Sequence, residues 1–278
     1  MAEASQLRVL PAELRNRIFE YALTAPEDLR YCMPVEGASK PTFRVSATET
    51  DEAVTSHPFN QLKFVSRQFY AETAGIEIRL NTISFALQNG SAMSPAEHLT
   101  EFLQSMSPKA RSWLRKVIVR DDNPQYRHHS TIVLQDTAET ISKLAEICER
   151  LPSVTLYYVL SKWTFSEEVT TSEMLSFLRN GIMCASALKG QELTDMLGER
   201  SLIHFTARYW IHRLDDWKGN VDVRSLRSSN VKFVPNMASK GSAVISSLDR
   251  YLEHFLLKWE NRAEQMVTLL KRWTDEGI

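Results

Sequence analysis

The stretch Thr82-Ile83-Ser84-Phe85-Ala86-Leu87 decides the fold, because bulky apolar residues alternate in it with small or polar ones. Alternation with a period of two predicts a β-strand that buries one face. A helix follows directly, since Ser94-Pro95-Ala96-Glu97 is a capping box with proline in the first turn. The apolar residues of that helix recur at helical spacing, and they are Leu99, Phe102, Leu103 and Met106. This part of the chain therefore predicts a strand-helix unit.

Two more units follow along the chain. Residues Leu114–Asp121 place Val117 and Val119 on one strand face, and Val154–Leu160 is a β-branched and aromatic run typical of a buried strand. Helices are expected after each of them, capped at residues 136–139 and 170–173. Consecutive strand-helix-strand connections form right-handed crossovers around a parallel sheet. We expect an α/β (or α+β) fold with a small, mostly parallel sheet or an irregular repeat arc, and the pattern leaves both arrangements open.

The last third of the chain is expected to be mainly helical. Residues 203–217 carry apolar side chains in steps of four and three, and Val231–Val234 indicates an edge strand. A long helix is predicted from about 246 to 274. We therefore predict that residues 81–278 form an α/β partner-binding region with a C-terminal helical cap.

The N-terminal part, residues 1–80, is expected to be a helical module. Residues 11–23 indicate a helix with Pro11 at its first position and a stripe of Leu14, Ile18 and Tyr21. Residues 61–79 indicate a second helix, with Asn60 as its N-cap. Between them, prolines interrupt residues 24–60, which predicts a long loop with a weak hairpin formed by 31–35 and 42–47. The stripe on the first helix either packs on the second helix or is exposed to bind a partner.

Composition argues against several classes of function. The 33 basic and 34 acidic residues leave a net charge of -1, which argues against nucleic acid or a membrane surface as the main partner. No two of the 9 glycines lie within six residues of each other, which excludes G-x-G phosphate loops and G-x-S-x-G elbows. The 3 cysteines are far apart and indicate neither a disulfide framework nor a zinc ribbon. We expect a non-enzymatic protein without metal or cofactor. No secretory or membrane-spanning segment is indicated, so an intracellular location, cytoplasmic or nuclear, is expected.

One basic segment, residues 109–129, stands out locally. It is either a solvated face or a weak site for nucleic acid or an acidic partner, with nucleic acid disfavoured by the net charge. The candidate partner-binding residues are Arg111, Arg115, Lys116 and Arg120.

Two blocks of sequence resemble a known family. Leu10-Pro11-Ala12-Glu13-Leu14, continued to Tyr21-Ala22-Leu23, resembles the opening of fungal F-box-like proteins, whose first helix starts Leu-Pro-x-Glu. A second block, Val65-Ser66-Arg67-Gln68 with Tyr70-Ala71-Glu72 and then Asn81-Thr82, resembles the family's following run. The blocks occur in the family's order within residues 10–87. Here residues 24–60 separate them, whereas an ordinary F-box is continuous.

The resemblance implies a docking module. In the F-box family the N-terminal helices bind the Skp-type adaptor of an SCF (cullin–RING) ubiquitin ligase, and the C-terminal region selects a protein substrate. On this basis Leu10, Pro11, Leu14 and Ile18 would face the adaptor. The alternative is an interaction or scaffold module unrelated to ubiquitin, which binds nucleic acid or an acidic partner through residues 109–129.

Overall fold

Within the residues that the structure describes, six strands form one sheet in the order β2-β1-β3-β4-β5-β6. Only β2 is antiparallel to its neighbour, and every other pair of adjacent strands is parallel. The strands are β1 (Leu29–Cys32), β2 (Thr42–Val45), β3 (Ile83–Ala86), β4 (Lys116–Asp121), β5 (Thr155–Thr164) and β6 (Val231–Asn236). The computed structural model describes residues 6–33, 41–45, 58–88, 91, 93–121, 138–164, 177, 180–182, 184–191, 224–236 and 263–278.

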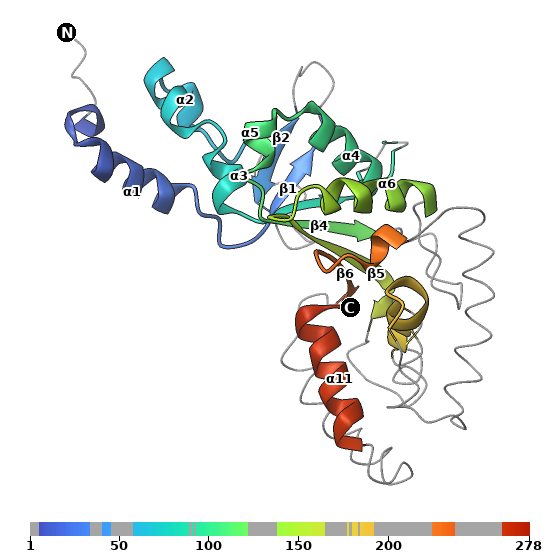
Figure 1. Ribbon diagram of the computed structural model, residues 1–278. Coiled ribbons are helices and arrows are strands. Elements are labelled where there is room, and N and C mark those ends of the chain that lie inside the picture. The colour runs from blue at the N-terminus through green and yellow to red at the C-terminus, as the bar shows by residue number, and fades with distance from the viewer. Residues whose placement is uncertain are drawn as a thin grey trace.

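Helices from all parts of the chain accompany the sheet (Figure 1). The N-terminal ones are η1 (Gln6–Val9), α1 (Ala12–Ala22), η2 (Leu62–Phe64), α2 (Arg67–Thr73) and α3 (Ile76–Leu80). The later ones are α4 (Pro95–Ser105), α5 (Pro108–Arg111), α6 (Ala138–Glu149), η4 (Cys184–Leu188), η5 (Arg224–Arg227) and α11 (Ala263–Glu276). The described chain is thus a mixed α/β fold with a mostly parallel sheet, as the sequence predicts.

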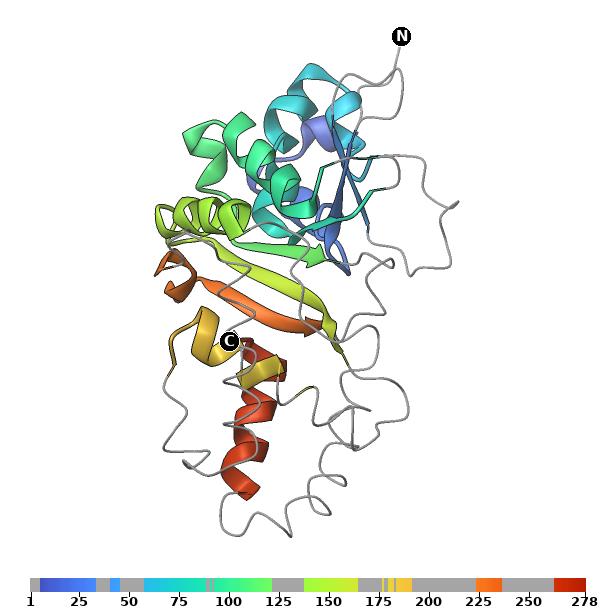
Figure 2. The same cartoon turned by 90° about the vertical axis from the view of Figure 1, so that its right-hand side faces the viewer.

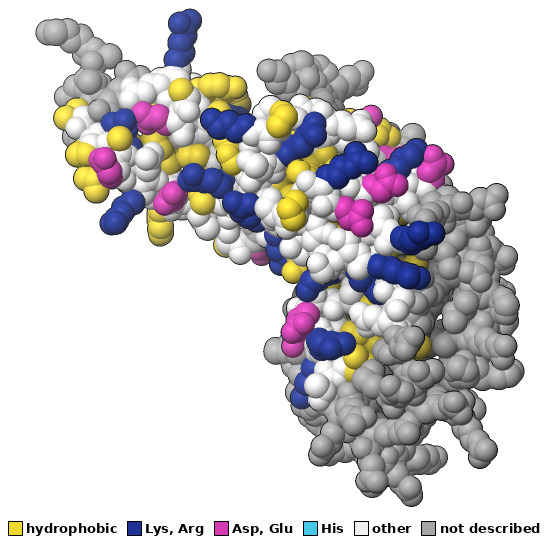
Figure 3. Space-filling view, viewed as in Figure 1, with side chains coloured by type: hydrophobic (Ala, Val, Ile, Leu, Met, Phe, Trp, Pro, Cys, Tyr) yellow, Lys and Arg dark blue, Asp and Glu magenta, His cyan; other side chains and the backbone are white. Residues whose placement is uncertain are grey.

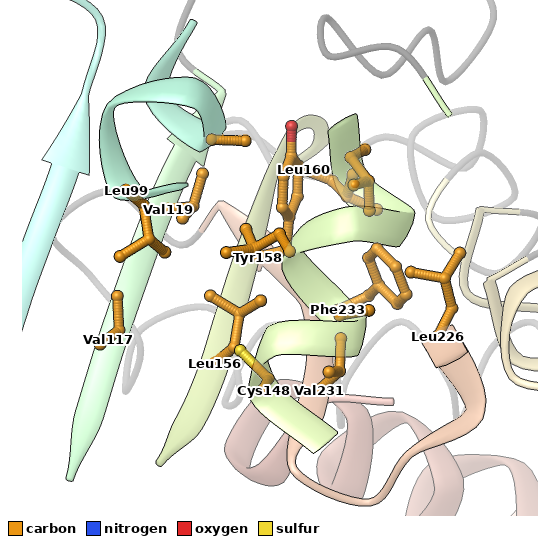
Figure 4. Packing of buried hydrophobic residues seen from close by; sticks show 14 of the residues in the cluster. Leu99, Val117, Val119, Cys148, Leu156, Tyr158, Leu160, Leu226, Val231 and Phe233 are labelled. Carbon is orange, nitrogen blue, oxygen red and sulfur yellow. The ribbon is translucent and has the colours of Figure 1, made fainter. Parts of the chain in front are cut away.

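The main core lies between the sheet and the helices α4 and α6, which lie side by side on one of its faces (Figure 2). Alternate residues of β4, β5 and β6 point into this layer, as Figure 4 shows for Val117, Leu156 and Phe233. The capping box predicted for α4 is present. The Glu97 backbone N–H donates to Ser94 Oγ (3.2 Å), and the Ser94 backbone N–H donates to Glu97 Oε2 (2.7 Å).

The hairpin within the predicted loop is present and extends the sheet. β1 and β2 pair antiparallel, with Arg30 opposite Arg44. β1 also lies parallel to β3, with Leu29 opposite Ile83. The sheet therefore begins inside residues 24–60, whereas the sequence indicated only a loop with a separate hairpin there. The four-residue strands are too short for their periodicity to predict this pairing.

The prediction of a continuous helix over residues 61–79 is wrong. The segment is divided into η2, α2 and α3, because Ser66 caps α2 and Gly75 ends it with a left-handed φ of 84°. A Cβ atom at Gly75 would lie 2.4 Å from the Trp113 ring, so the close approach of that ring also requires glycine. Asn60 is not an N-cap: its Nδ2 atom donates to Thr73 O (3.1 Å) and Glu77 Oε2 (2.9 Å).

The end of the chain packs on the last strand. The backbone of Ile278 exchanges two hydrogen bonds with that of Phe233 in β6 (2.8 and 2.9 Å). On α11, Trp273 meets Trp163 of β5 edge-on, with 6.2 Å between ring centroids. The helix predicted to start at residues 170–173 lies outside the described residues except for Phe177, and so do the helix predicted for 203–217 and the first part of the one predicted for 246–274. Among the described helices, none has the length and apolar character needed to cross a membrane.

Candidate docking surface

The N-terminal helices have a small core of their own. Phe19 and Leu23 of the α1 region and Phe69 of α2 are almost completely buried together. The rings of Phe19 and Phe69 meet edge-on with 5.7 Å between centroids, a favoured geometry for aromatic pairs. The first and second sequence blocks therefore pack into one unit, although residues 24–60 separate them in the chain.

Polar contacts join the same two blocks. Arg15 donates to both carboxylate oxygens of Glu72, from Nε at 3.1 Å and from Nη2 at 2.9 Å. The hydrogen bond from Arg15 lowers the pKa of the Glu72 carboxyl. Asn81 accepts from the Ala25 backbone N–H (2.6 Å) and donates to Leu23 O (2.7 Å), which holds the end of α1 beside α3.

The predicted stripe of α1 does not pack on the second block. Leu14 is 47% exposed, Ile18 40% and Tyr21 89%. The prediction that this stripe packs on the second helix is therefore wrong, and the stripe is exposed. The residues that pack on α2 belong to the neighbouring face of α1, which carries Phe19. Sequence periodicity missed Phe19 because both faces of α1 carry apolar side chains.

The exposed stripe is accompanied by further exposed apolar side chains of the N-terminal residues. Figure 3 shows yellow side chains at this end of the molecule, with charged and polar ones between them. We call the large hydrophobic residues that are exposed in the described part of the chain the apolar patch: Val9, Leu14, Ile18, Tyr21, Phe64, Val65 and Tyr70.

The other two predicted adaptor-binding residues flank α1. Pro11 is exposed and is the N-cap residue, so α1 begins at Ala12, one position after the start at Pro11 that the sequence predicted. Leu10 is half-buried, and its carbonyl oxygen accepts a hydrogen bond from Arg15 Nη1 (2.6 Å). Arg15 thus fixes both the entry into α1 and the position of α1 on α2.

The predicted basic residues do not converge on one site. Arg111 Nε donates to Met106 O (3.1 Å), and Arg115 Nη1 donates to Ser112 O (3.3 Å), so both contact the backbone around α5. Lys116 and Arg120 lie on β4, where Arg120 pairs with Asp28 (3.3 Å). Residues 122–137, including His128 and His129, lie outside the described part.

Cys148, Cys184 and His98 are buried in the core, whereas the Cys32 thiol is partly exposed. Burial raises the pKa of the Cys148 thiol to about 12, and it also raises that of Cys184. His98 Nε2 lies 2.9 Å from Ser91 Oγ, and burial lowers the pKa of the imidazole. Within the described ranges, no three His, Cys, Asp or Glu residues are grouped so that they would hold a metal ion.

Glu72 and Asn81 connect the N-terminal helices in a way that the sequence did not indicate. Glu72 and Asn81 belong to the second sequence block, yet the contacts that they make reach residues more than fifty positions earlier. Spacing within one sequence does not reveal such a distant partner.

Comparisons with family models, with curated proteins and with solved structures find no match for the chain. The resemblance to F-box-like proteins therefore rests on the two sequence blocks themselves.

Proposed function

We propose that the chain is a non-enzymatic F-box-like adaptor that docks the Skp-type subunit of an SCF (cullin–RING) ubiquitin ligase through its N-terminal helices. Residues 81–278 then hold a protein substrate, in the cytoplasm or nucleus. The observation that carries this proposal is the apolar patch, since every large hydrophobic residue that is exposed in the described part lies among the N-terminal residues 9–70.

An apolar patch of this kind indicates a protein partner. Hydrophobic residues exposed singly across a surface are ordinary, but their concentration at one end of a protein favours an interaction site there. Leu14 and Ile18 are four residues apart and so share one helix face, which fits docking against a partner's groove. The packing of Phe19 on Phe69 keeps that face directed away from the module's own core.

The test is co-purification of the full chain with a fungal Skp-type adaptor, followed by size-exclusion chromatography. We expect a one-to-one complex that the double substitution Leu14→Asp/Ile18→Asp abolishes. Because both side chains are exposed, that variant should keep the wild-type melting temperature. The control variant is Lys109→Gln/Arg115→Gln, which changes the net charge by the same amount. Lys109 is exposed and Arg115 contacts the backbone of Ser112, both away from the patch, so this variant should leave the complex intact.

Two outcomes would count against the proposal. If the folded wild-type protein forms no complex, the alternative of an interaction or scaffold module unrelated to ubiquitin is favoured. If the complex survives Leu14→Asp/Ile18→Asp in a folded protein, the adaptor binds elsewhere on the chain.

A further inference from the structure

The face of the sheet opposite α4 and α6, which we call the outer face, carries a concentration of positive charge. Side chains alternate along each strand, so the neighbours of the buried core residues point to this face. On β4, for example, Val117 and Val119 are buried in the core, whereas Lys116 and Arg120 lie on the outer face. The cations placed there by this alternation are Arg30, Arg44, Lys116, Arg120 and Lys232.

These cations come from both ends of the sheet. Arg30 and Arg44 face each other across β1 and β2, whereas Lys232 lies on β6 at the opposite edge. The row crosses five strand spacings of ~4.8 Å, or roughly 24 Å. An extended peptide rising ~3.3 Å per residue crosses it with about seven residues.

Within the described part of the chain, acidic partners on this face are scarce. Arg120 pairs with Asp28, but no ion pair among the described residues involves Arg30, Arg44, Lys116 or Lys232. Like charges directly opposite each other, as at Arg30 and Arg44, destabilise a sheet. The Arg44 Nε atom is moreover buried without a hydrogen-bond partner among the described residues. Arg30 Nη2 donates to Leu87 O (2.9 Å), and a carboxylate bound between the two guanidinium groups would offset their mutual repulsion.

The remaining side chains indicate the chemistry of the partner. Tyr157 is the aromatic residue of this row, and its ring is contacted by the ammonium groups of Lys116 (4.7 Å to the centroid) and Lys232 (5.9 Å). Proteins that bind single-stranded nucleic acids stack nucleobases on the faces of aromatic rings. Two ammonium groups already contact the Tyr157 ring, so it is poorly suited to such stacking. The half-exposed Ile118 and Val234 lie between the cations and favour a partner that also has apolar side chains. Both features favour a peptide over a nucleic acid.

We propose that the outer face binds an extended acidic segment of a partner protein, with carboxylates on Arg30, Arg44, Lys116 and Lys232 and apolar residues on Ile118 and Val234. This surface belongs to the strands and not to the N-terminal helices, so it does not depend on the docking of a ligase adaptor. It also differs from the basic segment 109–129, because it combines cations from β1, β2, β4 and β6 and leaves out Arg111 and Arg115.

The experiment measures fluorescence anisotropy of the full chain with a labelled peptide of repeating Glu-Glu-Val, at about 50 mM and about 300 mM salt. A peptide of repeating Gln-Gln-Val and a labelled oligothymidylate are the comparison probes. We expect the acidic peptide to bind in a salt-sensitive manner and more tightly than either comparison probe.

The variant Lys116→Gln/Lys232→Gln should weaken peptide binding about tenfold, since each lost charge contact reduces affinity roughly threefold. Lys109→Gln/Arg115→Gln removes the same charge away from the outer face and should change binding less than about twofold. Lys116→Gln alone, at an exposed position, is the second variant if the double variant does not fold.

Three results would overturn the proposal: no binding of the acidic peptide at the lower salt, an equal loss in the Lys109→Gln/Arg115→Gln protein, or tighter binding of oligothymidylate. The last would identify the outer face as a nucleic-acid surface. Leu14→Asp/Ile18→Asp should leave peptide binding unchanged, so failure here and failure of adaptor docking are distinguishable.

Discussion

Arg15 and Glu72 form a two-point ion pair that fastens α1 to α2, with N···O distances of 2.9 and 3.1 Å. Both residues belong to the sequence blocks that resemble F-box-like proteins, and 57 positions separate them in the chain. The side chains are 15% and 23% exposed, so water screens the pair only partly. Together with the Phe19–Phe69 contact, the pair holds the two blocks as one unit that displays the apolar patch.

We predict that Arg15→Met and Glu72→Gln are coupled in their effect on stability. Because the pair is bidentate and partly buried, a double-mutant cycle should give a coupling free energy of about 1 kcal/mol. The measurement is the free energy of unfolding from urea titrations at pH 7. Arg79 and Glu20 form a more exposed pair, and the same cycle there should give about 0.3 kcal/mol. Equal coupling in the two cycles would contradict the special role of Arg15.

The two faces of α1 should respond differently to truncation. Phe19 is fully buried, so Phe19→Ala should lower the free energy of unfolding of the N-terminal helices by about 3 kcal/mol. Leu14 is 47% exposed, so Leu14→Ala should change it by less than about 0.5 kcal/mol. Hydrogen exchange of the amides of α1 and α2 resolves this local effect. A loss of similar size in both variants would show that Leu14 is part of the core.

How much of this molecule its sequence predicts depends on the range of the interaction. The strands β3, β4 and β5 and their parallel orientation follow from local alternation and from the helices predicted between them, and the capping box at Ser94 follows from its own four residues. The placement of β1 beside β3 does not, because four-residue strands carry too little periodicity. The cation row of the outer face was not predictable either, because distant strands assemble it. Of the four basic residues predicted for partner binding, only Lys116 and Arg120 lie on that face.

The division of the predicted helix 61–79 leads to a further prediction at Gly75. Spacing alone did not reveal the break, because the apolar positions keep helical steps through it. Gly75→Ala should lower the free energy of unfolding by about 2 kcal/mol or more, since alanine is strained at a φ of 84° and its Cβ would meet the Trp113 ring at 2.4 Å. In the control Ala71→Gly, an exposed position inside α2, the loss should be about 1 kcal/mol. Urea titration of both proteins distinguishes the two losses. If Gly75→Ala is as stable as the wild type, the break at this position is not required by its backbone.

The last prediction concerns acid stability and His98. Burial lowers the pKa of this imidazole below its usual 6.5, although Glu101 and Glu97 act in the opposite direction. As the pH falls below 6.5, the unfolded chain therefore takes up the proton before the folded one does, and the free energy of unfolding decreases. His98→Gln removes this titrating imidazole. The free energy of unfolding that the wild type has in excess of the variant should therefore shrink as the pH is lowered from 7 toward 5. The remaining six histidines are the same in both proteins and cancel in that difference. Urea titrations at closely spaced pH values measure it, and a difference that stays constant over this range would mean that His98 titrates alike in the folded and unfolded chains.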